Sequence, residues 1–182
     1  MNRVELSGLP RAHRVHFVLA WALCALAVLL TAATWLPGPS KVPFAAVGVV
    51  LVSIFPLFGA ALLRVLISEG GRTLLDKANI GLLGRFAWSL STGLRCSYAV
   101  VLAALLLALA TGGAARDTGT DEHYYTRWNN MERRSERVAI TEDESHEATK
   151  AQARVFAAGA GLFHAVGGFL ILVAASPAAA PR

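Results

Sequence analysis

The stretch VFAAGAGLFHAVGGFLILVAA (155–175) contains no aspartate, glutamate, lysine or arginine. An α-helix needs about 20 apolar residues to cross the roughly 30 Å hydrocarbon core of a bilayer. Three further uncharged runs of similar length occupy residues 17–36, 44–63 and 96–115. The helices of a soluble protein would instead carry polar stripes at a 3.6-residue period. The sequence therefore predicts an all-α integral membrane protein with four transmembrane helices.

The composition agrees with this class. Of the 182 residues, 55% are hydrophobic and 16% are charged, whereas a soluble domain has about 25% charged residues. The net charge of +5 is explained by attraction to anionic lipid, because no basic cluster accompanies a nucleic-acid-binding pattern. We expect the lipid bilayer as the surroundings and no nucleic acid partner. The alanine-rich composition and small size suggest a bacterial protein.

The connections between the runs predict their arrangement. The proline-glycine turn at 37–43 makes the first two helices antiparallel neighbours, and Pro56 should kink the second helix. After Gly70 and Gly71, apolar residues at helical spacing predict an amphipathic helix in the membrane interface. The expected elements form one domain (1–182), with membrane helices at about 17–36, 44–66, 96–115 and 142–175, an interfacial helix at 73–92 and a polar loop at 116–141.

The segment TEDE (141–144) predicts where the fourth helix begins. Thr141 and Glu144 can form a capping box, in which the hydroxyl accepts from a helical N–H and the carboxylate reaches back to the cap. Acidic residues fill the first turn, where the helix dipole favours negative charge. Glu147 lies in pairing range of Lys150. We therefore expect a helix that extends beyond the membrane before its apolar run begins, at the end of a polar connection of about 40 residues.

Basic residues around the first helix set the expected orientation. Three precede it in the N-terminal arm and one follows it in the first loop, and the more basic flank usually stays in the cytoplasm. The total numbers of lysines and arginines in the loops on the two sides of the membrane are nearly equal, so these totals do not decide the orientation. We expect a multi-pass plasma-membrane protein with both termini in the cytoplasm and the loop over residues 116–154 outside the cell.

His164 lies near the middle of the fourth apolar run. Ionisable side chains at that depth are costly and usually face protein or water. Small residues share its helical face and predict close helix packing there: Ala157, Ala160, Gly161, Ala165 and Gly168. The opposite face, which we expect to contact lipid, carries Phe163, Val166, Leu170 and Val173.

Two interpretations of His164 remain open. As a structural residue, it would bond to a carbonyl or hydroxyl of a neighbouring helix, with Ser53, Thr31 and Thr34 as candidates. As a functional intramembrane residue, it would serve a proton relay, a transport site or a redox centre. The apolar runs contain no charged residue, which weakens the transport interpretation. Because Ser53 and Ser97 have no evident pairing with His164, no catalytic residue is predicted.

The polar loop contains an aromatic group and two acidic segments. Tyr124, Tyr125 and Trp128 would either lie on the membrane surface or contact a protein partner, because aromatic residues are frequent interface hot spots. DEH (121–123) and EDESHE (142–147) contain metal-ligating residue types, but the HExxH spacing is absent. We predict no metal site and no cofactor.

These features favour a non-catalytic accessory or interaction protein. Its partner surface would be the polar loop together with the glycine-alanine face of the fourth helix, and the partner would be a membrane or extracellular protein or a second copy of the chain. One alternative is a small transporter or channel component that acts as an oligomer. Another is a redox or enzyme subunit that uses His164.

Overall fold

The computed structural model describes residues 8–38, 42–68, 71, 80–111, 124–129, 131 and 133–175. The protein is mostly helical, and four helices are long and apolar enough to cross a membrane: α1, the combined α2 and α3, α6 and α7. In chain order the elements are α1 (Arg11–Ala33), α2 (Phe44–Val52), α3 (Ile54–Ile67), α5 (Ile80–Ser89), α6 (Thr92–Thr111), β1 (Tyr124–Asn129), β2 (Arg134–Ala139) and α7 (Glu142–Ala175).

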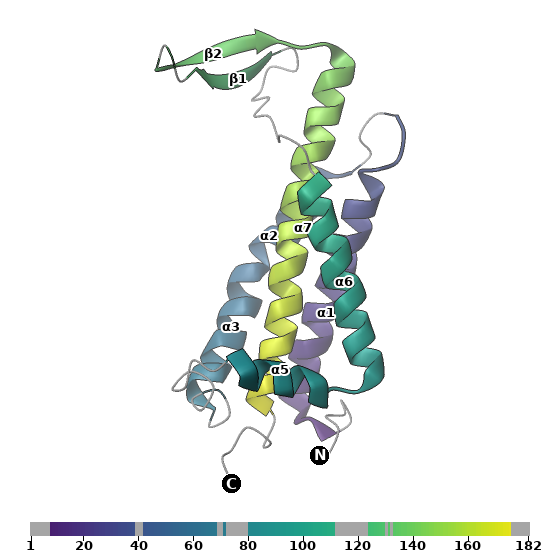
Figure 1. Ribbon diagram of the computed structural model, residues 1–182, viewed down its shortest axis with the longest axis vertical. Coiled ribbons are helices and arrows are strands. Elements are labelled where there is room, and N and C mark those ends of the chain that lie inside the picture. Colours follow the sequence, from purple (N-terminus) through teal and green to yellow (C-terminus); the bar gives the residue numbers. More distant parts are fainter. Residues whose placement is uncertain are drawn as a thin grey trace.

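Helix α7 is the centre of the bundle, where it contacts α1, α2, α3 and α6 (Figure 1). Gly161 allows a close approach, because a Cβ atom there would lie 3.0 Å from the Leu105 side chain on α6 and 3.1 Å from Cβ of Ala27 on α1. In the half of the bundle where α1 begins, the rings of Trp21 on α1 and Tyr98 on α6 meet edge to face, with centroids 4.9 Å apart. Small residues and aromatic contacts together hold three helices around one seam.

The second apolar run has a local break at Ser53, where the backbone keeps helical dihedral angles and the Ser53 N–H still donates to the Val49 carbonyl oxygen at 3.0 Å. Helix α2 ends at Val52 and α3 begins at Ile54, with Ser53 in a turn between them. Pro56 follows three residues later. It lacks the N–H that a continuous helix requires, and its ring crowds the preceding turn. The Ser53 hydroxyl donates to the carbonyl oxygen of Val50 at 2.8 Å, so both polar groups of this bond lie in the turn just before Pro56.

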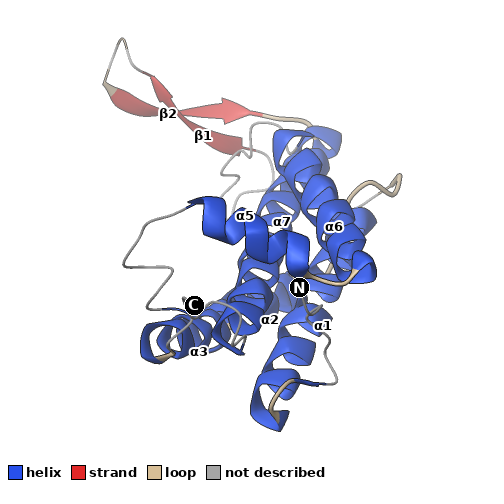
Figure 2. Ribbon diagram, turned by 60° about the horizontal axis from the view of Figure 1, so that its bottom comes forward, coloured by secondary structure: helices blue, strands red, loops and turns tan. Residues whose placement is uncertain are grey.

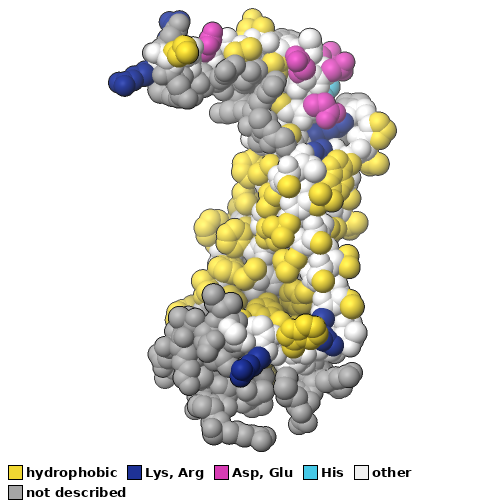
Figure 3. All heavy atoms as spheres, viewed as in Figure 1, with side chains coloured by type: hydrophobic (Ala, Val, Ile, Leu, Met, Phe, Trp, Pro, Cys, Tyr) yellow, Lys and Arg dark blue, Asp and Glu magenta, His cyan; other side chains and the backbone are white. Residues whose placement is uncertain are grey.

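The outer surface of the bundle is apolar between two charged ends (Figure 3). Phe55, Val100 and Leu107 are each more than half exposed. Among the described residues, every aspartate and glutamate lies in the hairpin or the first turns of α7. Soluble monomers rarely expose such a continuous apolar surface, whereas hydrocarbon between two headgroup layers suits it.

The connection before α7 contains a β-hairpin, so the prediction of an all-α chain is wrong for this segment. Strands β1 and β2 pair antiparallel, with Tyr124 opposite Ala139 and Asn129 opposite Arg134. In the turn, the Asn129 side-chain oxygen accepts from the N–H of Met131 at 3.0 Å, and Arg133 has a φ of 49°. A local side-chain turn of this kind brings two strands together without an apolar core.

Helix α5 lies across the end of the bundle at which α1 begins and α7 ends (Figures 1 and 2). Phe86 and Leu90 are buried against the bundle, while Trp88 is 73% exposed. This division agrees with the amphipathic pattern of the expected interfacial helix. Residues 73–79 of that expected helix lie outside the described part of the chain.

Candidate functional site

His164 joins α7 to the break between α2 and α3. Its side chain is 1% exposed, and its Nε2 atom lies 3.1 Å from the Val50 carbonyl oxygen and 3.1 Å from the Ser53 hydroxyl. The buried Nδ1 atom has no hydrogen-bond partner among the described residues. In the uncharged ring we therefore assign the proton to Nε2, where Val50 accepts it, and leave the lone pair on Nδ1. Of the three hydroxyls considered from sequence, Ser53 is the one that contacts His164.

Ser53 was one of the three structural partners expected for His164, whereas a catalytic pairing of the two was not expected from the sequence. A serine beside a histidine is the start of a catalytic arrangement, but the base also needs a third group that orients it. No such group contacts Nδ1 of His164 in the described part of the chain, and the Ser53 hydroxyl donates to Val50 instead. The geometry therefore supports a structural anchor at the helix break.

The small-residue face of α7 is buried at all five positions: Ala157, Ala160, Gly161, Ala165 and Gly168. At Gly168 a Cβ atom would lie 3.2 Å from the Tyr98 hydroxyl and 3.4 Å from the Trp21 ring. On the opposite face Phe163 and Val166 are exposed, but Val173 is fully buried, so its expected contact with lipid is wrong. Because α7 is surrounded by neighbouring helices, it does not have one buried face and one lipid-facing face along its whole length.

The first turns of α7 carry two cations that hold the ends of other helices, which we call the basic clamp (Lys150 and Arg154). The Lys150 side chain is 4% exposed; its Nζ atom donates to the Leu36 carbonyl oxygen at 3.2 Å and to Glu147 at 2.9 Å. The Glu147 contact confirms the pairing expected from their spacing. The contact with Leu36 joins α7 to the chain just beyond the end of α1.

Arg154 contacts two helix ends. Its Nε atom donates to the Thr34 hydroxyl at 2.9 Å, Nη1 donates to the Thr111 carbonyl oxygen at 3.1 Å, and the guanidinium lies over the Trp35 ring at 5.4 Å. Terminal carbonyls of a helix lack intrahelical donors, and the dipole there favours a positive charge. The clamp was missed from sequence, although Lys150 and Arg154 lie four residues apart, on the face that continues to the buried small residues.

The hairpin carries the expected partner contacts Tyr124, Tyr125 and Trp128. Consecutive strand positions alternate between faces, so positions 124 and 128 lie on one face of β1 and position 125 lies on the other. Tyr124 is exposed, whereas the side chains of Tyr125 and Trp128 lie outside the described part. The strand geometry therefore places position 125 on the opposite face of β1 from positions 124 and 128.

The described residues include no group of three or more histidine, cysteine, aspartate or glutamate side chains placed to hold a metal ion. His146 and Glu142 come within 3.7 Å of each other on the first turns of α7, and residues 121–123 lie outside the described part. Comparisons with models of known protein families, with curated proteins and with solved structures found no match to this chain.

Proposed function

We propose that the chain is a non-catalytic accessory protein of the bacterial plasma membrane, anchored by four transmembrane helices, whose hairpin β1–β2 binds a protein partner outside the cell. The observation that carries this proposal is the hairpin, which projects to one side from the end of α7 (Figure 1). The proposed orientation rests on the three basic residues before the first apolar run (17–36) against one in the loop after it.

Within the described part of the chain, the second strand of the hairpin buries little of its surface. The two strands of the hairpin are six residues each, and every residue of β2 is exposed apart from the half-buried Val138. An isolated two-stranded hairpin is only marginally stable in water, whereas a third strand or a packed face stabilises it. A protein partner could add a third strand at the edge of the hairpin and cover one of its faces. The added strand would use the same backbone pairing that joins β1 to β2.

The attachment of the hairpin suits a docking arm. Helix α7 runs without interruption from Glu142 to Ala175, and the basic clamp fixes its outer part to the ends of α1 and α6. A binding surface on a positioned element loses less entropy on association than one on a free linker. The contacts of His164, by contrast, join helices to one another, so they support the accessory role better than transport or catalysis.

The test is site-specific photo-crosslinking in intact cells. A photoreactive residue replaces Met131, which is 98% exposed at the hairpin turn, or Leu36, which is 61% exposed beyond α1 and serves as the matched control. We expect one protein to be captured in stoichiometric amount from position 131 and not from position 36. Replacement of Tyr124, Tyr125 and Trp128 with serine should abolish that product.

The other outcomes are equally informative. The same products from both positions, or capture that survives the triple serine replacement, would refute the docking role of the hairpin. A cross-link between two copies of the chain would assign the hairpin to self-association, and the oligomeric transporter alternative would then be tested by solute flux.

A further inference from the structure

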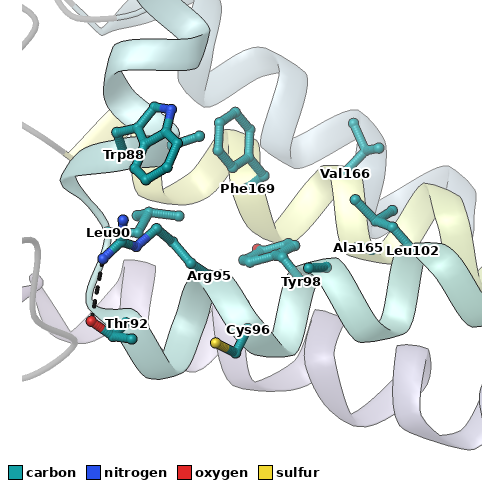
Figure 4. A pocket seen from close by; sticks show the side chains of 12 residues that line it. Trp88, Leu90, Thr92, Arg95, Cys96, Tyr98, Leu102, Ala165, Val166 and Phe169 are labelled. Carbon is teal, nitrogen blue, oxygen red and sulfur yellow. Dashed lines mark hydrogen bonds between the residues drawn. The ribbon is translucent and has the colours of Figure 1, made fainter.

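A cavity of about 710 Å³ is lined by residues of α5, α6 and α7, and Figure 4 shows the side chains around it. Its size falls within the range of small-molecule sites. Small side chains of Ala87, Ala99 and Ala165 leave the space open, and Tyr98 and Phe169 form part of its wall. Most of the described lining residues are apolar; the exceptions include the cation Arg95, the weakly polar Thr92 and Cys96 beside it, and the hydroxyl of Tyr98.

Arg95 is held at the rim of this cavity. Its Nη2 atom donates to the Thr92 hydroxyl at 3.2 Å, and its guanidinium lies over the exposed Trp88 ring at 5.2 Å. The Nε atom is buried and has no hydrogen-bond partner among the described residues. A guanidinium with an unused buried donor is suited to an oxyanion, which it can bind through two parallel N–H groups.

We propose that this cavity binds one anionic phospholipid from the bilayer, with the phosphate at Arg95 and an acyl chain along the seam between α6 and α7. The chain would extend from the level of Arg95 towards Leu102 and Val166, which lie deeper along the same wall. Seven residues of α6 separate Arg95 from Leu102, or about 10 Å of helix. A phospholipid presents this combination of a charged end and a long apolar body.

The charge decides which lipid is selected. Hydrocarbon in the bilayer is as apolar as the cavity wall, so the wall alone gives little preference for one lipid over another. A cation at headgroup level attracts anionic lipids, and the N–H groups in the first turn of α6, which begins at Thr92, favour a negative group nearby. No acidic side chain of the described residues lines the cavity, so none of them neutralises the charge of Arg95 within it.

The test measures lipid binding to the full chain in a mild detergent by native mass spectrometry. The probes are phosphatidylglycerol, phosphatidylcholine with the same acyl chains, and inorganic phosphate. We expect one phosphatidylglycerol to bind about tenfold more tightly than phosphatidylcholine, as for one charge-assisted contact in a partly desolvated site, and we expect phosphate alone to compete poorly.

Three variants separate the cavity from general surface charge. Arg95→Gln should remove the preference for phosphatidylglycerol. Arg85→Gln is the matched control, because Arg85 is an exposed arginine of α5 outside the cavity lining, and it should keep the preference. Ala99→Trp fills the cavity from an exposed position and should weaken binding of both lipids. Helical circular dichroism of each variant identifies any loss of folding. Arg95→Lys is a milder change that keeps the positive charge.

A second readout uses the native thiols. Cys96 is exposed and lines the cavity, whereas Cys24 is fully buried, so a maleimide should modify Cys96 alone. Phosphatidylglycerol should slow that modification more than phosphatidylcholine does.

Four results would overturn the proposal: equal binding of the two lipids, an equal loss in Arg85→Gln and Arg95→Gln, unchanged binding in Ala99→Trp, or displacement of the lipid by inorganic phosphate. The last would identify a site for a free anion.

Discussion

The basic clamp gives a quantitative prediction for Arg154→Met. This change removes the guanidinium and keeps most of the apolar stem, so cavity formation contributes little. It leaves the Thr111 carbonyl oxygen without its donor and ends the contacts with the Thr34 hydroxyl and the Trp35 ring. We expect α7 to be held less firmly against the ends of α1 and α6.

The magnitude follows from the three contacts that are lost. The part-buried bond to Thr34 contributes about 1.5 kcal/mol and the exposed bond to the carbonyl of Thr111 about 1 kcal/mol, at or below the lower end for charged donors because Arg154 is only partly buried. The contact with Trp35 adds about 0.5 kcal/mol. A further approach to the Thr34 carbonyl at 3.5 Å is too long to contribute much. The free energy of unfolding should therefore fall by about 3 kcal/mol.

The assay is unfolding in mixed micelles of a mild detergent and dodecyl sulfate, followed by helical circular dichroism. Arg154→Lys keeps a positive charge near two helix ends and should recover about 1 kcal/mol of the loss. Arg85→Met serves as the control for loss of an arginine. If Arg154→Met lies within about 0.5 kcal/mol of the unsubstituted chain, the interpretation of the clamp as a stabilising contact is refuted.

Three further changes test other contacts. Gly161→Leu should lower the free energy of unfolding by about 2 kcal/mol through overpacking, whereas Gly159→Leu, which meets nothing within 4 Å at Cβ, should be neutral or stabilising; equal effects in thermal unfolding would argue against the close seam. Ser53→Ala and His164→Leu should each cost about 1 kcal/mol and together about 1 kcal/mol more than their sum, because either group can satisfy the Val50 carbonyl; simple additivity would show that they do not share it. Thr141→Ala should destabilise the start of α7 by about 1 kcal/mol, seen as faster hydrogen exchange in its first turn and not in its apolar part; unchanged exchange would contradict the cap.

Features set by local sequence were the predictable ones. Apolar length alone indicates the four long helices, because the bilayer thickness fixes the requirement. The capping box is confirmed: the Thr141 N–H donates to Glu144 at 2.9 Å, and the Glu144 N–H donates to the Thr141 hydroxyl at 3.3 Å. Both signals involve residues within one turn or one continuous run.

The hairpin was missed because its strands lack the usual apolar alternation. The charged sequence of β2 resembles solvated loop, yet Thr126, Trp128 and Val138 are residue types with strand preference, and an asparagine turn separates the two strands. A search for paired short strands around Asn129 could have found it.

The helix-to-helix contacts depended on which elements become neighbours. Ser53 and His164 are 111 residues apart, and Arg154 is 120 residues from Thr34. No periodicity within a single segment specifies those pairs. The burial of Val173 has the same origin, because a helix surrounded by neighbours is covered on more than one face.

The uninterrupted course of α7 also has a mechanical consequence. Glu142 lies 12 residues before Arg154 and Ala175 lies 21 residues after it, so the helix extends about 18 Å on one side of the clamp and about 32 Å on the other. The clamp therefore divides α7 into two arms of unequal length, a shorter arm towards the hairpin and a longer arm within the bundle. The longer arm is packed among α1, α3 and α6, so a sideways pull at the hairpin end acts on that whole seam and does not swing the arm freely. Ala165 and Phe169 line the cavity on that longer arm, so tension on the hairpin would be transmitted to the cavity wall.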